Sequence, residues 1–296
     1  MGQDVPQFTL RDGKVMPQLG FGAWQIANAD CPAVIGEAIR VGYRAFDTAQ
    51  AYNNEEGVGR TIRECGLPRT DFFITSKLRN NAHSRDLALR SFDESMKKLG
   101  FDQLDLFLIQ WPVPNQDKYV EAWKVLVELQ QQGHIRSIGV SNFDREHLER
   151  IIGESGVTPV INQIELHPLY QQRTLRGYHA RRGIRIASWS PLGPGTTSAA
   201  WWWTHGRSTE GNLFGDPTIT AIARKHGRNP AQIILRWHVQ EGLLLNCKSA
   251  NPVRIAENFA LFDFELDAED IYRIEAMDRP ESGKIGAEPS EWNLLS

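Results

Sequence analysis

The chain has 296 residues, of which 41% are hydrophobic and 23% are charged, as is typical of a soluble globular protein with one or two domains. Its formal net charge of −3 argues against nucleic acid and anionic membranes as partners, no apolar run reaches membrane-spanning length, and the polar residues 1–7 lack the apolar core of a signal peptide. The three cysteines, Cys31, Cys65 and Cys247, are far apart and include no CxxC pair, which favours a reducing cytoplasm over a disulfide framework.

The first predicted element is a β-hairpin over residues 8–19. Two short apolar runs flank Asp12-Gly13, which is a strong signal for a two-residue turn. Residues 19–24 then predict a short apolar strand, and a helix with Pro32 in its first turn is expected to run to Val41.

The chain then repeats one unit, in which a helix ends at a glycine and a β-rich apolar run follows. Glycine is favoured just past a helix end because it adopts left-handed backbone geometry at little cost. The apolar runs are mostly continuous rather than alternating, which is typical of strands covered on both faces. Besides residues 19–24, the predicted strands are 45–47, 72–77, 104–110, 138–142, 160–165, 185–190 and 243–245.

Eight such strands with helical segments between them predict the α/β class and a (βα)8 TIM barrel, whose site lies at the C-terminal ends of the strands. We expect the hairpin to close the bottom of the barrel. No linker is visible, so residues 1–296 are expected to form one domain. A doubly wound sheet is the alternative, but it needs a glycine-rich fingerprint of which Gly20-Phe21-Gly22 and Gly57-Val58-Gly59 are only fragments.

Residues 193–216 interrupt the regular pattern. They contain Trp201, Trp202 and Trp203 between glycine-rich runs. A connection of this length is usually functional or disordered, and three adjacent tryptophans argue against disorder. Either the loop closes over a bound ligand and lines its pocket, or it packs against the barrel rim.

Side chains at the ends of barrel strands converge on one opening, where Asp47, Tyr52 and Lys77 suggest proton transfer. The pKa of tyrosine is about 10, and lowering it by about 2–3 requires roughly 3–4 kcal/mol. A cation about 4 Å away supplies that energy at an effective dielectric of about 20. Lys77 is the candidate cation, and Asp47 would keep it charged. The alternative is a structural Asp47–Lys77 ion pair with Tyr52 as a packing residue.

A second cluster of interest surrounds the last strand. Lys248 and Arg254 bracket Asn251 and Pro252, which are a good N-cap and a good first helical residue. Two cations beside a helix N-terminus predict an anion site, and the alternative is a solvated basic helix start. Trp189, at the end of another strand, either offers a flat face to a ring or belongs to the core.

Other chemistries lack their signatures. The sequence has no HExxH, no GxSxG and no Cys/His cluster at metal spacing, so no metal site is predicted. A glycosidase needs two facing carboxylates. Strand 104–110 ends in Gln110 rather than an acid, and Glu165 has no obvious partner because Asp47 is better matched to Lys77.

Motifs spread over nearly the whole chain carry a family resemblance: 42–49 with Tyr52 and Asn54-Glu55, 74–78, 105–109 with Trp111-Pro112, 137–143, 162–165, 190–193, and Lys248-Ser249 with Arg254, Glu257 and Asn258. In this order they resemble the aldo-keto reductase family. Residues 122–123, 162–171 and 262–264 are most similar to its bacterial 2,5-diketo-D-gluconate reductase-like members.

The resemblance implies that NADPH or NADP+ binds across the barrel opening and that the chain reduces aldehydes and ketones to alcohols as a cytoplasmic monomer. Tyr52 would be the general acid, tuned by Asp47 and Lys77, and Trp24 and Trp111 would wall the substrate pocket. The implied cofactor residues are Ser141, Asn142 and Gln163 at the carboxamide, Trp189 at the nicotinamide with Ser190 and Leu192 after it in the chain, Lys248, Ser249 and Arg254 at the 2′-phosphate, and Glu257 and Asn258 at the adenine.

Gln110 is the main departure from the family, which usually has histidine there to help bind and orient the carbonyl. Glutamine donates a hydrogen bond through its amide nitrogen but does not titrate near pH 7. Losing one optimised donor at a reacting oxygen costs about 10²–10³ in rate, of which a substitute donor recovers part. The alternatives to carbonyl reduction are therefore a cofactor-sensing barrel with weak catalysis, or reduction of a conjugated double bond or an imine.

Smaller departures lie on either side of the site. Asn53 replaces the usual glycine after the catalytic tyrosine and tolerates left-handed geometry. Asn246-Cys247 replaces the usual Ile-Pro before Lys248, which raises the expectation of a shifted strand. Trp292, the only aromatic residue after Tyr272, is expected to shape the pocket from the C-terminal tail.

Overall fold

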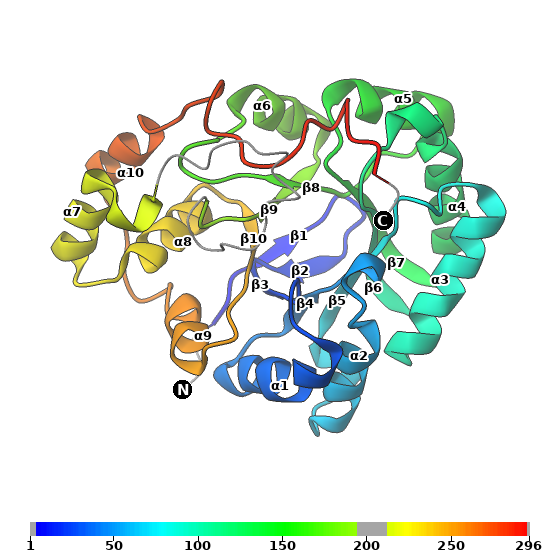
Figure 1. The fold of residues 1–296 in the computed structure, drawn as a ribbon, viewed down its shortest axis with the longest axis horizontal. Helices are drawn as coiled ribbons and strands as arrows, with labels where there is room; N and C mark the ends of the chain where they lie inside the picture. The colour runs from blue at the N-terminus through cyan, green and yellow to red at the C-terminus, as the bar shows by residue number, and fades with distance from the viewer. Residues whose placement is uncertain (1–3, 194–211, 295–296) are drawn as a thin grey trace.

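The computed structural model of the chain describes residues 4–193 and 212–294. Eight parallel strands close into a barrel in the order β10-β3-β4-β5-β6-β7-β8-β9, which confirms the predicted fold and rules out the doubly wound sheet (Figure 1). Each strand predicted from the sequence is present, with small shifts at its ends. The barrel strands are β3 (Leu19–Gly22), β4 (Ala45–Asp47), β5 (Phe73–Leu78), β6 (Leu104–Ile109), β7 (Ile135–Ser141), β8 (Ile161–Glu165), β9 (Arg185–Trp189) and β10 (Leu244–Cys247).

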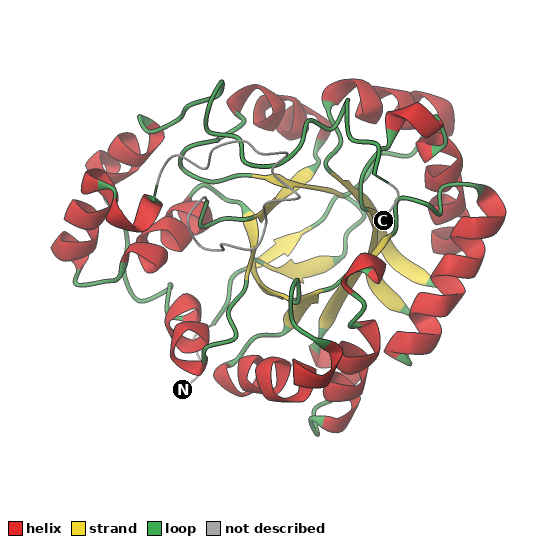
Figure 2. Ribbon diagram, viewed as in Figure 1, coloured by secondary structure: helices red, strands yellow, loops and turns green. Residues whose placement is uncertain are grey.

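Helices surround the barrel on its outside (Figure 2). None of the helices in the described part of the chain is long and apolar enough to cross a membrane. Two helices, α7 and α8, lie between β9 and β10, which accounts for the long last spacing in the sequence. The helices are α1 (Cys31–Val41), α2 (Glu55–Glu64), α3 (Arg85–Leu99), α4 (Tyr119–Gln131), α5 (Arg145–Ser155), α6 (Arg173–Arg182), α7 (Pro217–His226), α8 (Pro230–Gln240), α9 (Pro252–Phe259) and α10 (Ala268–Glu275).

The N-terminal hairpin pairs β1 (Gln7–Thr9) with β2 (Val15–Pro17) and closes the bottom of the barrel, as expected. Leu10 and Met16 join the apolar cluster inside the barrel. The turn is wider than the predicted two residues, because the Leu10 amide donates to the Lys14 carbonyl at 2.7 Å and Gly13 takes a φ of +80°. The Asp12 carboxylate accepts a 2.7 Å hydrogen bond from Ser137 of β7, which ties the hairpin to the barrel wall.

The barrel interior changes from apolar to polar along its axis. Successive side chains of a strand alternate between the interior and the surrounding helices. In β6, Leu106 and Leu108 belong to the cluster inside the barrel, whereas Phe107 packs in the helix-facing core. At the C-terminal ends of the strands, β4 instead ends in Asp47 and β5 carries Lys77. The fold therefore gathers polar side chains at one opening of an otherwise apolar barrel.

Candidate functional site

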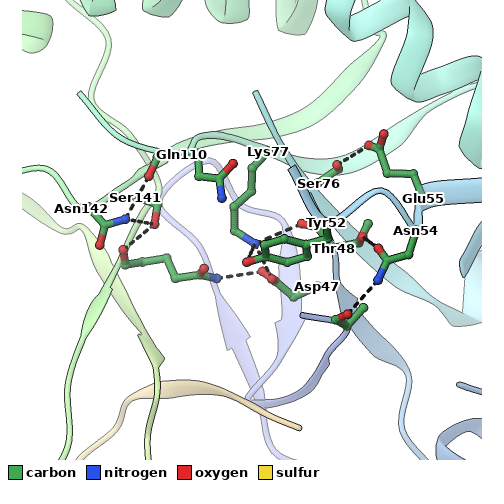
Figure 3. Close-up of polar contacts among 12 residues, drawn as sticks. Asp47, Thr48, Tyr52, Asn54, Glu55, Ser76, Lys77, Gln110, Ser141 and Asn142 are labelled. Carbon is green, nitrogen blue, oxygen red and sulfur yellow. Dashed lines mark hydrogen bonds and ion pairs between the residues drawn. The ribbon is translucent and has the colours of Figure 1, made fainter. Parts of the chain in front are cut away.

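Lys77 is at the centre of the polar group and is 1% exposed. Its ammonium forms an ion pair with the Asp47 carboxylate and donates to the Thr48 carbonyl at 3.0 Å (Figure 3). Its third partner is the hydroxyl oxygen of Tyr52 at 3.5 Å. An ammonium has three N–H donors, so these contacts use all of them. The Tyr52 oxygen is thus an acceptor for Lys77, and its own O–H can donate to another group.

Tyr52 belongs to the short 3-10 helix η2 (Gln50–Tyr52) that follows β4. The next residue, Asn53, has a φ of +55°, which confirms the expected left-handed geometry. Behind it, the buried Asn54 amide donates to the Ala23 and Ile26 carbonyls at 2.8 and 2.9 Å. Sequence reasoning did not find this support, which fixes the Tyr52 segment to the loop that carries Trp24.

The pKa values of Tyr52 and Lys77 correct the expectation that Lys77 lowers the pKa of Tyr52. Burial raises the pKa of Tyr52 above its usual value of about 10; Lys77 opposes this shift, whereas Asp47 adds to it. The expected lowering by Lys77 is therefore outweighed, because Asp47 neutralises much of the cation and burial disfavours a phenolate. Burial also opposes the charge on Lys77, but Asp47 and Tyr52 together raise the pKa of Lys77. Near neutral pH the site holds a charged lysine beside a protonated phenol.

A continuous hydrogen-bond network links the acid to the far side of the opening. The Gln163 amide donates to Asp47 at 2.8 Å, and the Gln163 carbonyl accepts from Ser141 at 2.8 Å. The Asn142 amide donates to the Ser141 hydroxyl at 3.1 Å, and its oxygen accepts from the Trp189 indole at 2.7 Å. The structure thus brings together the four residues expected to surround a nicotinamide.

Gln110 follows β6 and lies beside Lys77 and Tyr52 with its amide nitrogen turned toward them (Figure 3). It is 5% exposed, and its Oε1 is buried without a hydrogen-bond partner among the described residues. Its main-chain carbonyl accepts from Asn142 at 2.9 Å, which fixes the strand end. The amide nitrogen is therefore placed as a donor toward the site, and the amide oxygen has no protein partner within the described residues.

The start of α9 has the geometry of an anion site. The Asn251 side chain accepts from the Val253 and Arg254 amides at 2.9 and 3.2 Å, which confirms the predicted N-cap. Among the described residues, neither Lys248 nor Arg254 has an ion-pair partner. Partial burial lowers the pKa of Lys248, because desolvation disfavours its charged form. Two cations beside a helix N-terminus suit a phosphate.

The other residues expected at the adenine end lie on the same helix. Asn258 is buried and Glu257 is partly exposed, while Ser249 accepts from the Asn251 amide at 3.1 Å. The unusual Asn246-Cys247 pair ends β10, where Cys247 is in register with Phe21 of β3. The Cys247 thiol packs against the Tyr43 hydroxyl at 3.1 Å.

The tryptophans expected to wall the substrate pocket have different surroundings. Trp24 is partly buried beside the opening. Trp111 is 3% exposed and stacks on Trp292 of the C-terminal tail, with ring centroids 4.9 Å apart and planes at 28°. That contact places the C-terminal tail against Trp111, one of the two residues expected to wall the pocket. Trp201, Trp202 and Trp203 lie outside the described residues, as does most of the 193–216 loop.

Glu165 has partners that sequence reasoning did not find. Its carboxylate accepts from the amides of Ile285 and Gly286, both at 2.7 Å, and contacts His167 at 3.1 Å. The two amides belong to the C-terminal tail, 120 and 121 positions further along the chain, so no local sequence motif predicts them. Within the described part of the chain, no group of His, Cys, Asp or Glu is arranged to hold a metal ion.

Comparisons with known proteins show what this chain is similar to. The sequence profile of the Aldo/keto reductase family matches residues 18–279. An aldo-keto reductase of Mycolicibacterium smegmatis is 46% identical over 98% of both chains, and methylglyoxal reductase DkgA of Escherichia coli is 47% identical over 96% of both. Among solved structures, apo Gox0644 has a TM-score of 0.87 at 46% identity, covering 97% of this chain and 98% of its own. A Gox0644 mutant in complex with NADPH has a TM-score of 0.89 at 44% identity, covering 98% and 99%.

Proposed function

Because the chain belongs to the aldo/keto reductase family, we propose that Tyr52 donates the proton when this NADP(H)-dependent oxidoreductase reduces aldehydes and ketones to alcohols. The observation that carries this role is the arrangement of Lys77. All three of its N–H donors are used, one of them on the Tyr52 oxygen, so the phenol keeps its own proton for a substrate. NADPH, when bound, supplies the hydride.

Lys77 also stabilises the product of the proton transfer. Once Tyr52 gives up its proton, a phenolate oxygen lies 3.5 Å from a buried ammonium. At an effective dielectric of about 20, that attraction is worth about 4–5 kcal/mol. Asp47 keeps Lys77 charged and fixed in place, and Gln163 in turn holds the second oxygen of Asp47. Lys77 therefore offsets part of the burial cost that opposes a phenolate, and the pKa of Tyr52 stays above its usual value.

The residues at the opening fit NADPH in two separate places. Lys248 and Arg254, with Ser249, would hold the 2′-phosphate at the start of α9, and Glu257 and Asn258 would face the adenine. At the other end, the hydrogen-bond network would hold the nicotinamide. This second set comprises Ser141, Asn142 and Gln163 at the carboxamide, Trp189 against the ring, and Ser190 and Leu192 after it in the chain.

For substrates, we propose small carbonyl compounds bound between Trp24 and Trp111, with Gln110 and Tyr52 both donating to the carbonyl oxygen. The DkgA relatives are named methylglyoxal reductases, so methylglyoxal is the first compound to test. We further propose that residues 1–296 form one domain and that the protein works as a monomer in the cytoplasm. The three free cysteines support the location, because unpaired thiols suit a reducing compartment.

The test pairs a binding measurement with a turnover measurement. NADPH is titrated by protein fluorescence, and its oxidation is then followed with methylglyoxal, an aliphatic aldehyde, an enone and a cyclic imine. We expect binding with turnover of the aldehydes. Binding without turnover of any compound would instead favour the sensing barrel, and turnover of the enone or imine alone would favour the redirected reaction that Gln110 suggests.

A further inference from the structure

The C-terminal tail, residues 279–294, lies along the strand ends at the barrel opening (Figure 1). It begins with the Arg279 amide donating to the Leu169 carbonyl at 2.9 Å. It ends with the Leu294 carbonyl accepting from the Asn80 amide at 3.0 Å. The tail therefore spans from the loop after β8 to the loop after β5, past the residues of the candidate site.

Glu165 attaches the middle of this tail. It is the last residue of β8 and is 2% exposed. One carboxylate oxygen accepts from the Ile285 amide and the other from the Gly286 amide, each at 2.7 Å. Hydrogen bonds to an ionised acceptor are among the strongest in proteins. A buried carboxylate also needs such partners, because burying it unpaired is costly.

The same contact places the tail against the proposed nicotinamide platform. A Cβ on Gly286 would lie 2.6 Å from the Trp189 ring and 2.7 Å from the Glu165 carboxylate, so only glycine fits between them. The Trp189 indole is held on its other side by Asn142 at 2.7 Å. Glu165 therefore fixes the tail backbone directly on the edge of Trp189.

Beyond the anchor, the tail supplies the partner of Trp111. Ala287 and Trp292 pack with Trp111 and Val113 in one small apolar cluster. The Trp292 ring covers Trp111, and both side chains are at most 3% exposed. Because Trp111 directly follows Gln110, a displaced tail would uncover the pocket wall next to the proposed carbonyl donor.

We propose that Glu165 is a positioning residue whose carboxylate holds the tail and thereby keeps Trp292 on Trp111, so that the anchored tail selects small carbonyl compounds over bulky ones. This inference rests on the proposed reductase function. An anchored tail keeps the Trp111–Trp292 wall closed, which suits a substrate such as methylglyoxal. A released tail opens that wall and favours an aromatic aldehyde.

Two variants break the anchor from opposite sides. Glu165→Gln replaces one acceptor oxygen with an NH₂ group that faces a backbone N–H. Gly286→Ala adds a Cβ between Trp189 and the carboxylate. The controls are Glu149→Gln, which alters an exposed carboxylate on α5, and Gly153→Ala, where no atom lies within 4 Å of the added Cβ.

The first readout is hydrogen exchange of the tail in the full-length protein, which does not depend on turnover. We expect the amides of residues 285–294 to exchange at least about tenfold faster in both anchor variants, as expected for the loss of one charge-assisted hydrogen bond. The rest of the barrel and both controls should exchange like the wild type. Unchanged exchange of the tail would overturn the anchor, and so would exchange that rises across the whole barrel.

The second readout is selectivity, measured as the ratio of kcat/KM for methylglyoxal to kcat/KM for benzaldehyde. We expect that ratio to fall about tenfold in both anchor variants, mainly through KM, and to stay constant in the controls. A mobile tail with the wild-type ratio would overturn the selectivity role. If the wild type reduces neither aldehyde, the proposed function fails, whereas the exchange data still decide whether Glu165 anchors the tail.

Discussion

The ammonium of Lys77 lies 3.5 Å from the hydroxyl oxygen of Tyr52, and its other two donors are used on Asp47 and Thr48. This arrangement fixes the direction of the hydrogen bond between the two residues. Lys77 donates and Tyr52 accepts, so the phenol proton remains available. The same contact stabilises the charge that appears on Tyr52 once that proton leaves.

Replacing Lys77 should show that its effects on the catalytic rate and on the stability of the fold are separable. Lys77→Met should lower kcat by at least about 10²-fold, because the phenolate loses its stabilising charge. It should also lower the free energy of unfolding by about 3–5 kcal/mol, because Asp47 remains buried without its partner. Adding Asp47→Asn should restore much of the stability and none of the rate. Thermal unfolding and steady-state kinetics measure the two effects, and a double variant that regains activity would contradict the role of Lys77.

The raised pKa of Tyr52 predicts how the rates of carbonyl reduction and alcohol oxidation depend on pH. Carbonyl reduction needs the protonated phenol, which is the main form below the raised pKa, so kcat should stay level from about pH 6 to pH 9. Alcohol oxidation needs the phenolate, so its rate should still be rising at pH 10. Because glutamine does not titrate, Gln110 adds no inflection near pH 6.5. Rate profiles in both directions test this, and a reduction rate that halves between pH 7 and pH 8 would count against it.

Gln110 should show opposite effects on stability and activity. Its Oε1 is buried without a partner among the described residues, and such an atom costs about 1–3 kcal/mol. Gln110→Met keeps the volume and removes that atom, so it should raise the melting temperature. It should also lower kcat/KM by about tenfold or more, because the amide donor is lost. Gln110→His should instead retain activity and introduce a pH inflection near 6.5, and a fully active methionine variant would remove the donor role.

The proposed anion site at the start of α9 predicts that removing a cation there weakens the binding of NADPH but not of NADH. Lys248→Met removes a cation that has no ion-pair partner among the described residues. Losing one charge-assisted hydrogen bond to the 2′-phosphate should weaken NADPH binding about 10- to 100-fold. NADH lacks that phosphate, so its affinity should change less than about twofold. Fluorescence titration of both cofactors compares them, and equal losses would refute the 2′-phosphate assignment.

Much of the site could be predicted because the C-terminal ends of all the barrel strands lie around the same opening. Asp47 ends β4 and Lys77 is next to last in the adjacent parallel strand β5, so identifying the strands already placed them together. The N-cap role of Asn251 was equally predictable, since it depends on a local pattern of residues. The family resemblance then assigned chemistry to positions that spacing alone left open.

What could not be predicted depends on burial and on contacts between distant segments. The direction of the Tyr52 pKa shift required the balance between desolvation and two opposing charges. The two amides that donate to Glu165 come from the C-terminal tail. No periodic pattern in the sequence predicts the path of this tail across the opening. The hairpin turn is wider than its Asp12-Gly13 signal predicted, and Asp12 also accepts from Ser137, a residue far along the chain.

The most direct test of the central claim is Tyr52→Phe, which removes the phenol proton and keeps the ring. With methylglyoxal as substrate, we expect kcat to fall at least about 10³-fold while the Kd for NADPH changes less than about twofold. The melting temperature should stay close to that of the wild type, because Lys77 keeps its contacts with Asp47 and Thr48. A Tyr52→Phe variant that binds NADPH normally and turns over at the wild-type rate would contradict the account.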